Sequence, residues 1–169
     1  MALRLAVISD EVSQDWGKVL QFCQEFNCGV ELRSVTWGLV GQEEEYKTPF
    51  TLPMTAAQGM NYMADEMRVP VIGIASPFLK CGWDDQAAIA MHLEGLKHCL
   101  NMADLFHCNL VRVFNFLDPQ DPHTFVSAWH RALAIYREEV PRLLDRHPGI
   151  RLGLENEFST VGRTAKLAA

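Results

Sequence analysis

The sequence has no cluster of basic residues and no long apolar segment. Its 15 Lys and Arg are outnumbered by 21 Asp and Glu, which gives a formal net charge of −6. Because a nucleic-acid surface needs a basic patch, this balance argues against DNA or RNA as a partner. The apolar run at the start, "LRLAVIS", is too short for a signal peptide or a membrane span. We therefore predict a buried strand there and a cytoplasmic protein with no membrane contact.

Two kinds of binding motif are also missing. The five cysteines show no CxxC spacing, so we expect free thiols in a reducing compartment rather than disulfides or a zinc knuckle. The first apolar run continues into "SDEVSQD", where a dinucleotide-binding fold would need glycines, and no GxxxxGK[ST] motif occurs. Both absences argue against a nucleotide cradle.

What the sequence does contain is a regular alternation of short β-rich runs and amphipathic helical segments. The predicted strands cover residues 3–9, 29–35, 69–76, 110–116 and 150–156. Apolar side chains recur every three or four residues between them, which predicts helices that pack on a core. The fourth helix is expected to continue through Val140 to "HPGI" (147–150), and a fifth to start at Ser159 or Thr160.

This alternation predicts a parallel sheet with helical crossovers, and two architectures fit it: an open doubly wound sheet or a (β/α)8 barrel. In both, ligands bind at the carboxyl ends of the strands. Every predicted strand of this sequence ends in polar residues, which would converge on one mouth in a barrel. The missing glycine-rich loop also favours the barrel.

Two acidic residues in predicted strands are candidates for chemistry. Glu155 ends the run "RLGLENEF", where a carboxylate on a rigid strand suits a divalent cation; the alternative is an acid that caps the next helix or faces water. Glu31 lies in the apolar run "GVELR" and is expected either to pair with Arg33, two residues on, or to contact substrate. The six histidines are predicted to lie in helices, away from the strand ends.

Four segments resemble successive strand-end motifs of the xylose isomerase-like barrels, the sugar phosphate isomerase/epimerase superfamily. They are "ISDEVSQDWGKVLQFCQEFNCGVELRSVTWG", "IGIASPFLK", "VRVFNF" and "LGLENEFSTVG". The resemblance follows the whole chain in order but reaches only five of the eight family strands. It implies a (β/α)8 barrel with a divalent metal (Mn, Mg or Zn) at its mouth. The glutamate of the "LEN" motif, here Glu155, would bind that metal and act as an acid/base beside a carbonyl.

The resemblance also sets limits on activity. Endonuclease IV, in the same superfamily, carries metal-binding histidines at the ends of strands three and four, where this sequence has Ser76 and Asn115, so we reject a nuclease. Position 157 is often His in such motifs and is Glu here. We predict a metal-using isomerase or epimerase of a sugar or polyol; the alternatives are a non-catalytic fragment or binding module, or a metal-dependent sugar or inosose dehydratase. Substrate contacts are predicted at Trp37, Ser76, Lys80, Asn115 and Glu157.

The length adds a structural expectation. A closed barrel typically takes about 250 residues, so residues 1–169 are predicted to be the N-terminal five βα units of an incomplete barrel. The other usual metal ligands of the family would lie beyond Ala169, so we expect weak metal binding or none. An arc of five strands has two exposed edges, which favours self-association as a dimer.

Overall fold

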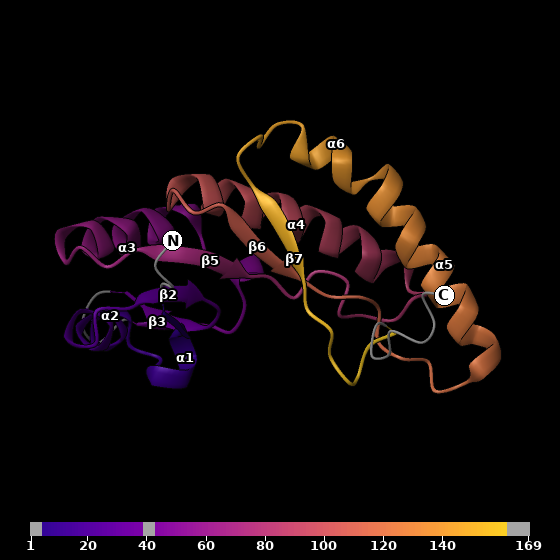
Figure 1. Cartoon of the computed structure of the whole chain (residues 1–169), viewed down its shortest axis with the longest axis horizontal. Helices are drawn as coiled ribbons and strands as arrows, with labels where there is room; N and C mark the ends of the chain where they lie inside the picture. Colours follow the sequence, from indigo (N-terminus) through magenta and orange to yellow (C-terminus); the bar gives the residue numbers. More distant parts are fainter. Residues whose placement is uncertain (1–4, 39–42, 162–169) are drawn as a thin grey trace.

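The computed structural model describes residues 5–38 and 43–161, whose main feature is one parallel sheet of five strands (Figure 1). Its strands are β1 (Ala6–Ile8), β2 (Gly29–Leu32), β5 (Val71–Ala75), β6 (Leu110–Val113) and β7 (Arg151–Leu154). Each lies within one predicted run, although every strand is shorter than the run that predicted it. All five predicted strands are therefore confirmed.

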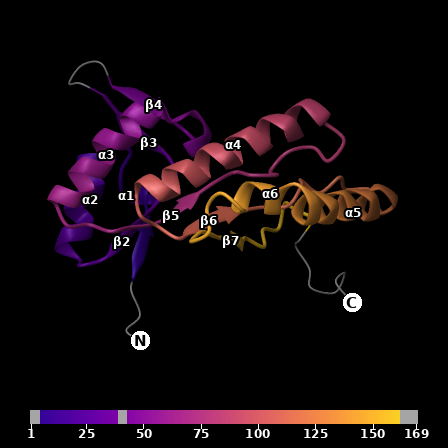
Figure 2. The ribbon, with the colours of Figure 1, turned by 90° about the horizontal axis from the view of Figure 1, so that it is seen from above.

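The order of the strands separates the two predicted architectures. They pair in chain order, β1-β2-β5-β6-β7, with every pairing parallel. A doubly wound sheet would reverse its order at a switch point, whereas consecutive barrel units add strands in one direction. The crossover helices α3 (Met54–Glu66) and α4 (Gln86–Leu105) lie on the same side of the sheet (Figure 2). The predicted incomplete (β/α)8 arrangement is thus confirmed.

The hydrophobic core lies between the sheet and these helices. Val30, Leu32, Val111 and Val113 alternate along β2 and β6 and are buried against the helical layer. Helix α2 (Trp16–Glu25) inserts Trp16, whose indole Nε1–H donates to the Met60 carbonyl of α3 at 3.1 Å. Residues between the buried ones, including Glu31 and Arg112, point to the opposite face. That face is the inside of the arc.

Three segments differ from the prediction. The connection 36–54 holds an antiparallel hairpin, β3 (Val35–Trp37) and β4 (Glu44–Tyr46), followed by the short helix η1 (Pro49–Thr51). Helix α5 (Pro122–Glu138) ends early and resumes as α6 (Val140–Leu144), because Pro141 has no N–H to continue the helical bonds. Ser9–Val12 forms the short helix α1. The helix predicted after Ser159 or Thr160 falls on residues outside the described part.

No helix in the described residues combines the length and the apolar character that a transmembrane span requires.

Candidate functional site

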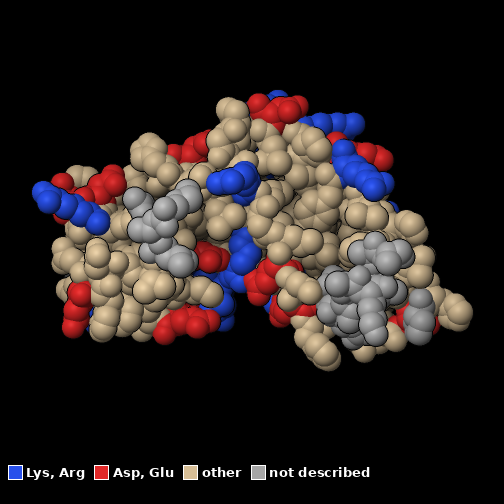
Figure 3. All heavy atoms as spheres, in the orientation of Figure 1, with Lys and Arg blue, Asp and Glu red and all other residues tan. Residues whose placement is uncertain are grey.

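A cavity of about 210 Å³ opens at the carboxyl ends of the strands, where barrels bind their ligands. Its walls come from β5, β6 and the segments that follow β2, β4, β5, β6 and β7. The lining residues are Arg33, Lys47, Thr48, Pro49, Ala75, Pro77, Lys80, Arg112, Phe114, Glu155 and Glu157. Basic and acidic side chains also meet near the middle of the face seen in Figure 3. The cavity therefore combines both signs of charge with one aromatic ring.

At the centre of the site, Arg112 lies between two carboxylates from other strands. Its Nε is 2.7 Å from Glu31 Oε1, and its Nη1 contacts Glu155 Oε2. The strand positions beside these residues are glycines: Gly153 pairs with Arg112 and Gly73 with Glu31, which leaves room for the long side chain to cross the sheet. Only 18% of the Arg112 side chain is exposed. We call this group the Glu31–Arg112–Glu155 triad.

The triad corrects the predicted partner of Glu31. Arg33 does not pair with Glu31; its Nε is 2.7 Å from Asp10 Oδ1, and its Nη2 is 3.3 Å from Glu11 Oε1. The reason is that β2 ends at Leu32, so the alternation that would have placed Arg33 beside Glu31 does not reach it. Hydrogen bonding to Asp10 raises the pKa of Arg33 above its ordinary value.

A second ion pair lies close to the Phe114 ring. Lys80 Nζ is 2.7 Å from Glu157 Oε2, and hydrogen bonding to Lys80 lowers the pKa of Glu157 below its ordinary value. Lys80 Nζ also lies 4.8 Å from the centre of the Phe114 ring, and the Arg112 guanidinium carbon lies 5.5 Å from it. One aromatic ring thus supports both cations of the cavity.

The loop that carries Lys80 is fixed by buried polar contacts. The Phe78 N–H donates to Ser76 Oγ at 2.9 Å, and the Leu79 N–H donates to His92 Nδ1 at 3.0 Å. His92 belongs to α4 and is buried beneath this strand-end loop, so the prediction that every histidine lies away from the strand ends is wrong for it. Its spacing of three and four residues from Ile89 and Leu96 was the signal that could have found it.

The structure brings together only some of the predicted site residues. Lys80, Glu155 and Glu157 line the cavity. Ser76 instead bonds within its own loop, and Asn115 is buried with no hydrogen-bond partner for Nδ2 in the described part of the chain. Trp37 packs against α3, where a Cβ at Gly59 would lie 2.7 Å from its ring.

Apart from Arg33, which was predicted only as a partner of Glu31, sequence reasoning missed three charged or aromatic residues of the lining, namely Lys47, Phe114 and Arg112. A signal existed for Arg112, since it is a charged residue between Val111 and Val113 in an otherwise apolar strand. The same pattern had singled out Glu31. No comparable signal marks Lys47 or Phe114.

The residues present do not fit a divalent cation. In the described ranges, no three His, Cys, Asp or Glu side chains converge as metal ligands would. Glu155, the predicted ligand, already has Oε2 in contact with the Arg112 guanidinium. A guanidinium and a metal cannot share that oxygen without strong repulsion. The metal predicted from the family resemblance therefore has no fitting ligand set here.

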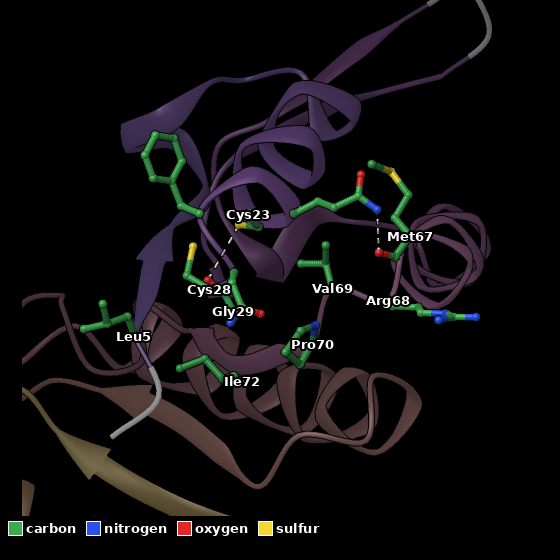
Figure 4. Close-up of a pocket in the computed structure, with 12 residues that line it drawn as sticks. Leu5, Cys23, Cys28, Gly29, Met67, Arg68, Val69, Pro70 and Ile72 are labelled. Carbon is green, nitrogen blue, oxygen red and sulfur yellow. Dashed lines mark hydrogen bonds between the residues drawn. The ribbon is translucent and has the colours of Figure 1, made fainter. Parts of the chain in front are cut away.

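A larger cavity of about 820 Å³ lies at the amino ends of β2 and β5, opposite the site (Figure 4). Two of its polar side chains donate hydrogen bonds to backbone carbonyls. Cys23 Sγ lies 3.7 Å from the Gly29 carbonyl, and Gln24 Nε2 donates to the Met67 carbonyl. Burial raises the pKa of the Cys23 thiol to about 12, so it is no nucleophile near neutral pH. This end of the sheet offers no chemistry comparable to the triad.

Comparison with known proteins supports the fold from structure alone, because no family model and no curated relative matches the sequence. A D-tagatose 3-epimerase-like protein superposes with a TM-score of 0.68 at 16% identity, over 97% of this chain and 58% of that one. The IOLI protein with a binding zinc atom gives 0.63 at 10% identity, over 98% and 56%. D-allulose 3-epimerase from Methylomonas sp., in complex with D-allulose, gives 0.60 at 12% identity, over 94% and 52%.

The chain therefore spans about half the length of the solved proteins it matches. At these identities the likeness concerns the fold, and it agrees with the parallel strand order described above. The fold of this chain is that of part of a (β/α)8 barrel, as in the solved proteins it matches.

Proposed function

We propose that this chain forms part of an isomerase or epimerase of a sugar or polyol, with residues 1–169 as its first five βα units. The observation that carries the proposal is the charged cavity at the carboxyl ends of the strands. The bound D-allulose of one structural neighbour supports a sugar as the ligand class. We place the protein in the cytoplasm, which its five free, buried cysteines support.

In this proposal Glu155 moves the proton. Contact with Arg112 holds Oε2 and fixes the orientation of the carboxylate, so Oε1 is the oxygen that takes a proton from the carbon beside the carbonyl. Return of that proton to the former carbonyl carbon, while the proton of the neighbouring hydroxyl passes to the carbonyl oxygen, isomerises the sugar. Epimerisation needs a second proton donor, such as a water molecule, on the opposite face of the carbon that lost the proton. Lys80 and Glu157 contact substrate hydroxyl groups. No step passes through a metal, because the residues present do not fit one.

Incubation of the chain with a ketose in D2O tests this function. We expect D-allulose or a related ketose, or an inosose-type polyol ketone, to gain deuterium at the carbon beside its carbonyl. NMR of the sugar measures that exchange, and amide shifts of the labelled protein report binding near Lys80, Glu155 and Glu157. Binding without exchange would make the chain a binding module, and a product that has lost water would make it a dehydratase. If no compound of the panel binds, the sugar proposal fails.

We also propose that the chain self-associates as a dimer. In the described residues β1 and β7 each pair with one strand only, and unpaired edges attract another chain. Leu154 of β7 is 55% exposed, which is unusual for a large apolar side chain on a strand. Light scattering should give twice the mass of one chain. Leu154→Arg should shift it to the monomer mass, and Tyr62→Arg, on the exposed side of α3, should not. A wild-type monomer would contradict this.

A further inference from the structure

We infer that the Arg112 guanidinium is the fixed cation of this site and occupies the position on Glu155 that a divalent metal would need. The site then polarises a substrate carbonyl with N–H groups rather than with a metal ion. The carbonyl part of this inference rests on the proposed function. The competition between Arg112 and a metal for Glu155 does not.

The geometry shows that Arg112 is built into the site. It is held by carboxylates of two other strands, Glu31 on β2 and Glu155 after β7. The Phe114 ring lies beside its guanidinium carbon. Contacts from three directions fix the charge in one place, which is the requirement for preorganised electrostatic catalysis.

The charges of the triad explain why a metal is not accommodated. One guanidinium and two carboxylates already form a compact set with a net charge of −1. A divalent cation bound to Glu155 Oε2 would have to displace the Arg112 guanidinium. The Arg112 side chain, only 18% exposed, would then lie beside the positive charge of the metal. At this burial water screens the repulsion only in part. The arginine and the metal are therefore mutually exclusive.

The first polar residues after β5 and β6 are not carboxylates. Ser76, after β5, uses its hydroxyl oxygen to accept from the Phe78 N–H. Asn115, after β6, is buried with an amide nitrogen that has no partner among the described residues, and its amide group carries no charge to balance that of a cation. Both are neutral, whereas hard divalent cations are usually held by carboxylates.

Arg112 retains the donors that a carbonyl needs. Its Nε lies 2.7 Å from Glu31 Oε1 without a hydrogen bond among the described residues, and Nη1 contacts Glu155 Oε2, so we assign the remaining N–H groups of the guanidinium to a ligand. A guanidinium offers its N–H groups in a fixed plane, so an oxygen that gains charge as a proton leaves the adjacent carbon finds donors already oriented.

Manganese titration followed by electron paramagnetic resonance tests the competition without any sugar. Wild type should bind no Mn²⁺ at Glu155. Arg112→Met frees Glu31 and Glu155 and should raise Mn²⁺ affinity by about tenfold or more, since one cation no longer opposes the other. Arg142→Met removes an exposed arginine on α6 and should change nothing. Arg112→Lys, which cannot reach both acids in the same geometry, serves if Arg112→Met does not fold.

Two results would overturn the inference. One is tight Mn²⁺ binding by wild type with paramagnetic broadening at Glu155. The other is a folded Arg112→Met protein with unchanged Mn²⁺ affinity. In the sugar assay, exchange should survive EDTA in wild type and be lost in Arg112→Met, and exchange that EDTA abolishes would count against Arg112 as the cation. If no sugar binds at all, the proposed function fails while the manganese result still decides the role of Arg112.

Discussion

Glu155→Gln should lower the rate of deuterium exchange into the bound ketose by about 10²–10⁴-fold, the usual contribution of a positioned acid/base. The amide keeps the shape of the carboxylate and can still accept a hydrogen bond from Arg112 Nη1, so the site should keep its geometry. What it loses is the ability to take up a proton. Exchange rates at saturating ketose, measured by NMR, give the effect on the chemical step separately from binding.

Matched variants separate this role from general damage to the site. Glu66→Gln, on the exposed end of α3, removes one carboxylate elsewhere and should leave exchange unchanged. Glu157→Gln weakens the contact with Lys80 and should reduce binding more than the rate at saturation. An unchanged rate in Glu155→Gln, with binding intact, would show that another group moves the proton.

Local patterns in the sequence were enough to predict the sheet and its helices. β-branched runs such as 110–116 and apolar spacing such as that around Trp16 depend on neighbouring residues only. The alternation also predicted parallel pairing, because a parallel crossover needs a helix, but it left the order of the strands open between a doubly wound sheet and a barrel. The break at Pro141 could also have been predicted, since proline interrupts helical hydrogen bonding regardless of the fold.

The triad could not be predicted in the same way. Which acid Arg112 meets depends on the register of β2, β5, β6 and β7 and on the space left by Gly73 and Gly153. A charged residue in an apolar strand indicates that a partner exists but does not identify it. The prediction chose Arg33 for Glu31 because it was near in sequence, whereas the actual partner is brought near only by the folded sheet.

The loop between β5 and α4 links stability to the site through one histidine. His92 Nδ1 accepts the hydrogen bond of the Leu79 N–H, and Leu79 adopts a φ of 64°, a left-handed backbone that is unfavourable for leucine. The next residue is Lys80, which forms the cation of the second ion pair. A separate cavity of about 520 Å³ beside His92 is lined by Lys80, Glu94 and His98, and the Phe50 ring lies edge-on to the imidazole with the ring centroids 5.2 Å apart. The position of Lys80 therefore depends on this buried bond.

His92→Leu should lower the free energy of unfolding by about 1–3 kcal/mol, because it leaves the buried Leu79 N–H without an acceptor.

Burial lowers the pKa of His92, so the unfolded chain binds a proton more readily than the folded protein. Wild-type stability should therefore decline as the pH falls below about 6.5 and level off below the lowered pKa. His92→Leu should lack this part of the decline, and His130→Leu, exposed on α5, should keep it. Urea unfolding across this pH range measures both effects, and equal pH profiles for wild type and His92→Leu would refute the role of His92.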